Sequence, residues 1–210
     1  MELQGRLQKT GKVLQGSNIS FMNIRVAHEK KGCAEKILPF LKDGESIYNT
    51  LLVSKPGAGK TTCLRDCIRS LSNGKEGWEG MKICVVDERS EIAACHLGIP
   101  QNDMGIRTDV LSGCGKSEGM MLMLRSMSPQ IIAVDELGGK KDFQAVEQAA
   151  CSGVRILGTV HADTVEELWE KPYLKKWMKR GIFERFILIR YNRSGGRDFQ
   201  VFNGKREQLC

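Results

Sequence analysis

A glycine-rich segment at residues 54–62 constrains the fold of this chain more than any other feature. It begins directly after the apolar run Thr50-Leu51-Leu52-Val53, and a stretch with helical periodicity follows it. An apolar strand, a glycine-rich turn, a Lys-Thr pair and a helix are, in this order, the components of a phosphate-binding loop, or P-loop. The segment consists of Ser54, Lys55, Pro56, Gly57, Ala58, Gly59, Lys60, Thr61 and Thr62.

The residue types of this loop predict binding of ATP and Mg2+. Glycines allow backbone N–H groups to turn toward phosphate oxygens, and the following helix directs the positive end of its dipole at them. We expect Lys60 to reach the β- and γ-phosphates and the Thr61 hydroxyl to ligate Mg2+. Ser54 replaces the first glycine of the G-x-x-x-x-G-K-[ST] pattern, which requires that its φ angle be ordinary for an L-residue. The alternative is a glycine-rich turn that binds no nucleotide.

Length and composition indicate one sizeable α/β domain with a buried core, since the chain has 210 residues, of which 41% are hydrophobic. No apolar run approaches the roughly 18 residues that span a bilayer, and residues 1–15 contain no signal-peptide core. We therefore expect a cytoplasmic protein. The eight cysteines form no C-x-x-C pair and the three histidines have no ligand spacing, which argues against a disulfide framework and against zinc.

Positive charge is concentrated near the C-terminus. The net charge is +7, and residues 171–210 carry 11 basic and 3 acidic residues, so the rest of the chain is near −1. Such a basic segment favours an acidic partner surface, namely nucleic acid, anionic lipid or a neighbouring subunit. The alternative is a solvated positive face without a dedicated partner.

The remaining pattern alternates strands with helices. Largely apolar runs at residues 81–86, 129–134 and 154–160 predict buried strands, and helical periodicity occurs at 34–41, 116–127, 142–151 and 165–179. Residues 96–116 predict a long loop, 19–26 one or two strands, and 186–202 a hairpin. The pattern predicts an α/β fold with a mostly parallel sheet, helices on both faces and a C-terminal β-hairpin.

Polar side chains follow four of the predicted strands, at the edge of a parallel sheet where ligands bind. These are the P-loop, Asp87-Glu88, Asp135-Glu136 and His161. An apolar strand followed by Asp-Glu is the Walker B pattern, in which Asp135 holds Mg2+ and Glu136 orients and deprotonates the attacking water. The alternative for this pair is an N-cap of the following helix.

Other residues are weaker candidates on position alone. His161 can sense the γ-phosphate if its strand lies between the P-loop strand and the Walker B strand, with Thr159 a lesser candidate. Glu88 is a second acid near the phosphates or a capping carboxylate. Phosphoryl transfer also gains from an arginine, often from another subunit, and we rank Arg89 and Arg107 above the other arginines. For each arginine the alternative is a structural salt bridge.

Four segments together resemble the stage III sporulation protein AA family: NTLLVS at 49–54, VVDERSEIA at 85–93, GIRTDVL at 105–111 and DELG at 135–138. That family comprises ATPases of endospore-forming bacteria, related to the hexameric ATPases of type II and type IV secretion and pilus systems. The resemblance runs from about residue 23 to 191. It implies that Asp87-Glu88 is the acidic box and residues 158–162 the histidine box of these ATPases, which favours catalytic functions for Glu88 and His161.

The resemblance implies a RecA-like P-loop ATPase with an additional central strand. It further implies a homo-oligomeric, hexameric ring on the mother-cell face of a membrane channel during engulfment, peripheral to that membrane complex. Family members have an additional N-terminal domain, so residues 1–30 are interpreted as a stub of that domain and residues 31–210 as the ATPase domain with its basic C-terminal segment. Residues 162–164 and the basic tail match the family less well.

Two other functions are compatible with these residues. The basic C-terminus permits a nucleic-acid-dependent motor on the same fold, which salt-sensitive stimulation by DNA or RNA would reveal. A nucleotide-gated assembly protein without turnover is the second, although a pure binder has no need of Glu136.

Overall fold

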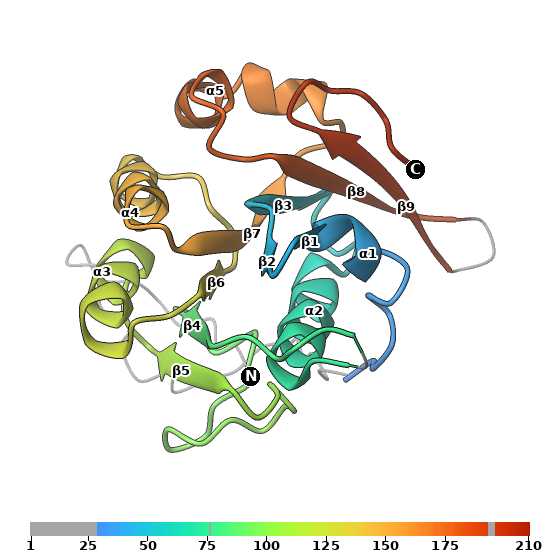
Figure 1. Ribbon diagram of the computed structural model, residues 1–210. Helices are drawn as coiled ribbons and strands as arrows, with labels where there is room; N and C mark the ends of the chain where they lie inside the picture. Colours follow the sequence, from blue (N-terminus) through green and yellow to red (C-terminus); the bar gives the residue numbers. More distant parts are fainter. Residues whose placement is uncertain (1–28, 76, 193–195) are drawn as a thin grey trace, which may run out of the picture.

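Seven strands form one sheet in the order β5-β4-β6-β7-β3-β8-β9 (Figure 1). The computed structural model describes residues 29–75, 77–192 and 196–210. All neighbouring strands are parallel except β8 and β9, which form an antiparallel hairpin. The strands are β3 (Thr50–Ser54), β4 (Ile83–Asp87), β5 (Thr108–Ser112), β6 (Ile131–Val134), β7 (Arg155–His161), β8 (Arg185–Tyr191) and β9 (Arg197–Asn203). The predicted α/β fold with a mostly parallel sheet and a C-terminal hairpin is confirmed.

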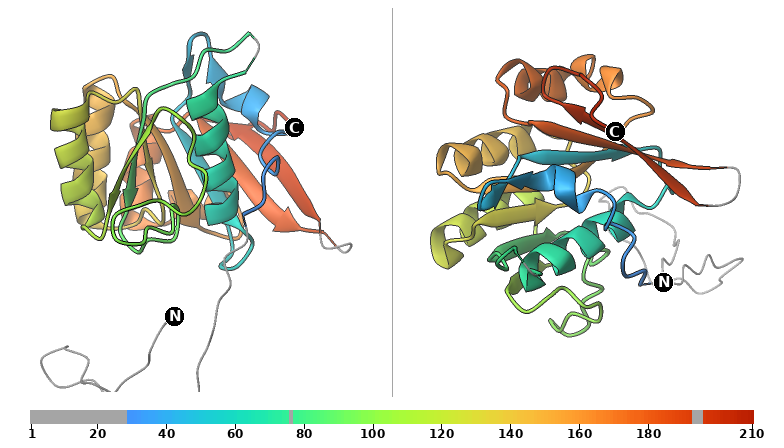
Figure 2. Two further views of the ribbon diagram at one scale, coloured as in Figure 1. Left: turned by 90° about the horizontal axis from the view of Figure 1, so that it is seen from below. Right: turned by 45° about the vertical axis from the view of Figure 1, so that its right-hand side comes forward.

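Helices cover both faces of this sheet (Figures 1 and 2). One face is covered by α3 (Lys116–Met127), α4 (Lys140–Cys151) and α5 (Pro172–Lys179), and the other by α1 (Leu38–Leu41) and α2 (Lys60–Asn73). A short 3-10 helix, η1 (Glu166–Trp169), precedes α5, and β1 (Lys42–Asp43) pairs with β2 (Ser46–Ile47) in a separate small sheet. None of the helices described has the length and apolarity needed to cross a bilayer.

The core has two layers because successive side chains of a strand point to opposite faces. Along β3, Leu51 and Val53 pack into the cluster under α3, α4 and α5, whereas Leu52 packs into the cluster under α1 and α2. All five residues of β3 are buried. Burial on both faces explains why the central strands appear in the sequence as continuous apolar runs.

Two local predictions were wrong. The loop predicted for residues 96–116 contains strand β5, an edge strand whose residues are all only half-buried. Its sequence, TDVLS, therefore lacks the continuous apolar run of a central strand. The helix predicted for residues 34–41 is confined to Leu38–Leu41 and is preceded by turns, because Pro39 lacks a backbone N–H and restricts the residue before it. The strands predicted for residues 19–26 lie outside the described residues.

Trp177 anchors α5 to the sheet, and we expect its replacement to be costly. The side chain is fully buried, with its ring centroid 5.7 Å from that of Phe143 and 5.3 Å from that of Phe183. Trp177→Ala should lower the free energy of unfolding by about 3–5 kcal/mol, because it leaves a cavity. Urea denaturation measures the change, with Tyr173→Ala as the control on an exposed position of the same helix. Equal losses in both variants would contradict this account of the packing.

Candidate functional site

The P-loop connects the end of β3 to the start of α2, and its backbone has the curvature that phosphate binding requires. Gly57 and Gly59 have φ angles of 79° and 86°, in the left-handed region that favours glycine. Ser54 has no positive φ angle, which meets the condition for a serine at that position, and its hydroxyl donates to the Lys55 carbonyl at 2.8 Å. Gly59 is the N-cap of α2, so the positive end of the helix dipole lies at the loop.

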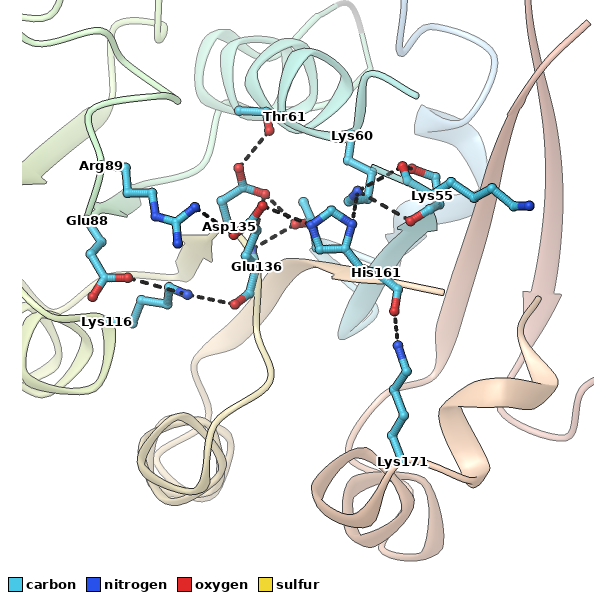
Figure 3. A network of polar contacts seen from close by, with 12 residues as sticks. Lys55, Lys60, Thr61, Glu88, Arg89, Lys116, Asp135, Glu136, His161 and Lys171 are labelled. Atoms are coloured by element: carbon cyan, nitrogen blue, oxygen red, sulfur yellow. Dashed lines mark hydrogen bonds and ion pairs between the residues drawn. The ribbon is translucent and has the colours of Figure 1, made fainter. Parts of the chain in front are cut away.

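Lys60 and His161 meet at the centre of this edge of the sheet (Figure 3). Strand β7 lies beside the P-loop strand β3, and their register pairs Ser54 with His161. This pairing places His161 next to the start of the P-loop. The Lys60 ammonium donates to the carbonyls of Ser54 and Lys55, both at 3.3 Å, and lies 2.9 Å from His161 Nδ1. Burial lowers the pKa of the Lys60 amine. The condition stated for His161 is met, since β7 lies between β3 and β6.

The Walker B pair follows β6 and faces the P-loop. The Thr61 hydroxyl donates to Asp135 Oδ2 at 2.7 Å. On the other side, the buried Thr159 hydroxyl donates to Asp135 Oδ1 and accepts the Glu136 backbone N–H at 2.9 Å. Thr159 therefore positions both acids at once, a larger contribution than its sequence position indicated.

The oxygen atoms of Thr61 and Asp135 fit a Mg2+ ion. Mg2+ in nucleotide sites takes one or two protein oxygens and completes its shell with phosphate oxygens and water. Across the described part of the chain, no group of three or more His, Cys, Asp or Glu side chains is arranged to hold a metal ion. A Mg2+ ion held by Thr61 and Asp135 would therefore take its remaining ligands from phosphate oxygens and water.

Two side-chain interactions hold the Glu136 carboxylate in place. His161 Nε2 lies 2.9 Å from Glu136 Oε1, and Arg89 Nη1 lies 3.2 Å from Glu136 Oε2. Because the Lys60 ammonium can only donate, Nδ1 of the imidazole accepts and Nε2 carries the proton that is donated to Glu136. The hydrogen bond from His161, aided by the charges of Arg89 and Lys116, lowers the pKa of the Glu136 carboxyl despite partial burial.

The backbone of Glu136 also departs from ordinary geometry. Its φ angle is 53°, in the left-handed region, which costs a residue with a side chain about 1–3 kcal/mol. The adjacent Leu137 N–H donates to the Thr159 carbonyl at 2.9 Å, so β7 holds the strained segment in place. Such strain is typical of functional positions.

Asp87 and Glu88 perform different functions in the structure. The Asp87 carboxylate is buried and accepts the backbone N–H groups of Glu91, Ile92 and Ala93, so it shapes the loop after β4. Glu88 lines a recess beside Asp135 and Glu136.

Lys116 is a candidate that sequence reasoning missed. Its ammonium lies 3.4 Å from Glu88 Oε2 and donates to the Glu136 carbonyl at 2.7 Å. The sequence offered no clear signal for it, because strand β5, which precedes it, lacks the apolar run of a central strand. Lys171 was missed as well, and its ammonium donates to the His161 carbonyl (Figure 3).

The two arginines ranked highest, Arg89 and Arg107, lie at opposite ends of the parallel strands. Arg89 follows β4 and contacts Glu136. Arg107 directly precedes β5, at the edge where the parallel strands begin, and its guanidinium donates to the Ser72 carbonyl at 3.2 Å. Within the chain, Arg89 lies at the cluster around Glu136, whereas Arg107 lies away from it.

Comparison with solved structures identifies the fold. The ATPase DotB of Legionella pneumophila aligns with a TM-score of 0.59 at 16% identity, covering 81% of this chain and 48% of that chain. The VirB11 ATPase of the Brucella suis type IV secretion system, solved with sulphate, aligns with a TM-score of 0.55 at 14% identity, covering 82% and 52%. The fold is thus that of the RecA-like secretion ATPases, with β6 and β7 between β4 and the P-loop strand.

Comparison of sequences identifies the family. Stage III sporulation protein AA of Bacillus subtilis (strain 168) is 40% identical over 202 residues, which are 96% of this chain and 66% of that protein. The chain thus spans somewhat under two thirds of the length of this relative and about half of the length of the two solved ATPases. The family model described as Sporulation stage III, protein AA matches residues 6–209, and the chain belongs to that family.

Proposed function

We propose that the chain is a Mg2+-dependent ATP hydrolase. One observation supports this most strongly: an unbroken series of polar contacts joins the P-loop to the Walker B pair. Thr61 contacts Asp135 directly, and Lys60 contacts Glu136 through His161. A turn that only connects a strand to a helix needs no such contacts, whereas phosphoryl transfer needs the phosphate site and the base aligned.

Each residue has a defined task in this proposal. The loop amides and Lys60 bind the phosphates, and Thr61 and Asp135 hold Mg2+, which neutralises charge on the β- and γ-phosphate oxygens. Glu136 orients the attacking water and accepts its proton. His161 bridges Lys60 and Glu136, so a γ-phosphate that draws Lys60 away also changes the hydrogen bonding of Glu136. Glu88 and Lys116 add one negative and one positive charge at the same end of the strands, beside Glu136.

Assembly and cellular context belong to the same proposal. We propose a hexameric ring in the cytoplasm, peripheral to a membrane-embedded secretion-like channel that operates between mother cell and forespore during engulfment. Membership of a sporulation family and the fold of secretion ATPases support this. In such a ring an arginine of one subunit can complete the site of the next, and Arg107 is available for that function because it is remote from its own site. Arg89 is the candidate within the subunit.

ATP hydrolysis measured over a range of protein concentrations tests this proposal. We expect activity that rises more steeply than protein concentration, because subunits share the site, and that does not respond to DNA or RNA. Stimulation by nucleic acid that falls steeply with salt would instead favour a nucleic-acid motor, to which the basic C-terminal segment would contribute. ATP binding without hydrolysis at any concentration would favour a nucleotide-gated assembly protein.

Thr159→Val tests the positioning of the two acids. Valine retains the shape but removes the hydroxyl, which leaves Asp135 Oδ1 and the Glu136 N–H without their shared partner. We expect the turnover number to fall about tenfold to hundredfold while ATP affinity changes little, because misplaced catalytic groups affect the chemical step. Steady-state kinetics with equilibrium ATP binding separates the two effects. An unchanged turnover number would show that Thr159 is not needed for positioning.

A further inference from the structure

Arg197 lies beside the P-loop although it is far from it in sequence. It is the first residue of β9, and its register partner in the hairpin is Tyr191, the last residue of β8. Because β8 runs parallel to β3, the end of β8 and the start of β9 lie at the same edge of the sheet as the P-loop. Figure 2 shows the end of β8 and the start of β9 on the side of the sheet where the P-loop lies. The topology thus brings a basic residue of the hairpin to the nucleotide site.

The Arg197 guanidinium packs directly against Gly59. A Cβ atom placed on Gly59 would lie 2.4 Å from Arg197 Nη2 and 2.8 Å from Cζ, so no side chain can be added there without moving Arg197. Gly59 is the N-cap of α2, so the guanidinium lies at the N-terminus of the P-loop helix. The close approach is a second reason for glycine at this position, besides its φ angle of 86°.

The guanidinium lacks partners in this position. Its Nε and Nη1 atoms are buried without a hydrogen-bond partner. No ion pair of Arg197 with a carboxylate is found among the described residues. Buried donors that make no hydrogen bond are costly, and a buried charge without a counter-charge more so.

The electrostatic surroundings point to an anion. The N-terminus of α2 carries partial positive charge, and the Lys60 ammonium lies in the same loop. A third positive group at this point is unfavourable unless negative charge is present. A bound nucleotide supplies such charge, because its phosphates occupy the N-terminus of the P-loop helix.

We propose that Arg197 is a nucleotide-binding residue whose guanidinium contacts the phosphate chain of a nucleoside di- or triphosphate in the P-loop. The proposal rests on the proposed function, since it requires the P-loop to bind nucleotide. In this proposal Arg197 moves from its unpartnered position on Gly59 to the phosphates when a nucleotide binds. The β8–β9 hairpin, which carries Arg197, therefore responds directly to nucleotide binding. Part of the basic charge of the C-terminal segment thereby has a ligand within the subunit.

Titration with a fluorescent ADP analogue tests this assignment. Arg197→Gln should weaken binding by about tenfold or more, because a charge-assisted contact to phosphate is lost. Lys205→Gln is the matched control, since it removes one positive charge from an exposed position after the same hairpin. Arg197→Lys, which retains the charge, should recover part of the affinity. Without nucleotide, the melting temperature of Arg197→Gln should equal or exceed that of the natural protein, because an unpartnered buried charge is removed.

The outcomes separate the assignment from the proposed function. If the natural protein binds ADP and Arg197→Gln binds it as tightly as Lys205→Gln does, the assignment is wrong and the proposed function stands. If the nucleotide-free Arg197→Gln melts well below the control, Arg197 is a structural support and the assignment is overturned. If the natural protein binds neither ADP nor ATP, the proposed function itself fails.

Discussion

Replacing Glu136 with glutamine is expected to reduce ATP hydrolysis by about a thousandfold while ATP still binds. Glutamine has nearly the shape of glutamate but cannot accept the proton of the attacking water, and general-base catalysis contributes about a hundredfold to ten-thousandfold. The phosphate-binding groups, Lys60 and the loop amides, are unchanged in this variant. Phosphate release under saturating ATP measures the turnover number, and equilibrium titration measures binding.

Glu45→Gln is the matched control for this experiment. Glu45 is exposed in the turn between β1 and β2, so the same chemical change there should leave hydrolysis unaltered. If Glu136→Gln hydrolysed ATP at the natural rate, Glu136 would not be the base. Attention would then turn to Glu88, another acid that lines the recess beside Asp135.

Lys60→Ala is expected to weaken ATP binding by about a hundredfold. The Lys60 ammonium is buried and lies among the carbonyls of the loop and His161. Its loss removes charge-assisted hydrogen bonds to two phosphate groups, and each tenfold loss of affinity corresponds to about 1.4 kcal/mol.

Calorimetric titration with ATP and Mg2+ measures the effect of Lys60→Ala. Lys175→Ala, an exposed position on α5, is the control for the loss of one positive charge. We expect the control to bind as the natural protein does. Equal affinities of Lys60→Ala and the control would mean that the P-loop does not bind the phosphates, which contradicts the basis of the proposed function.

Much of the fold was predictable from the sequence because its central strands are buried on both faces. The runs that became β3, β4, β6 and β7 are largely apolar, and the polar residues that end them converge in any parallel sheet. The edge strand β5 was not predictable from the same signal. Its residues are half-buried and mixed in polarity, so its sequence resembles a loop.

The candidate site was predictable only where strand ends define it. Asp135, Glu136 and His161 follow strands and lie together as predicted. Arg107 could not be distinguished from Arg89 by sequence, because the distinction depends on which edge of the sheet each residue occupies. Lys116 and Arg197 reach the site from a helix start and a hairpin whose positions depend on the order of strands, which no local pattern specifies.

The central claim is that this chain hydrolyses ATP at the cluster joining the P-loop to Glu136. A single-turnover experiment tests it most directly, with protein in large excess over ATP labelled on the γ-phosphate and at concentrations that favour assembly. We predict that labelled phosphate is released in the presence of Mg2+ and is retained in ATP when a chelator removes the metal. Full binding of ATP with Mg2+ present, but recovery of all the label as intact ATP, would contradict the claim.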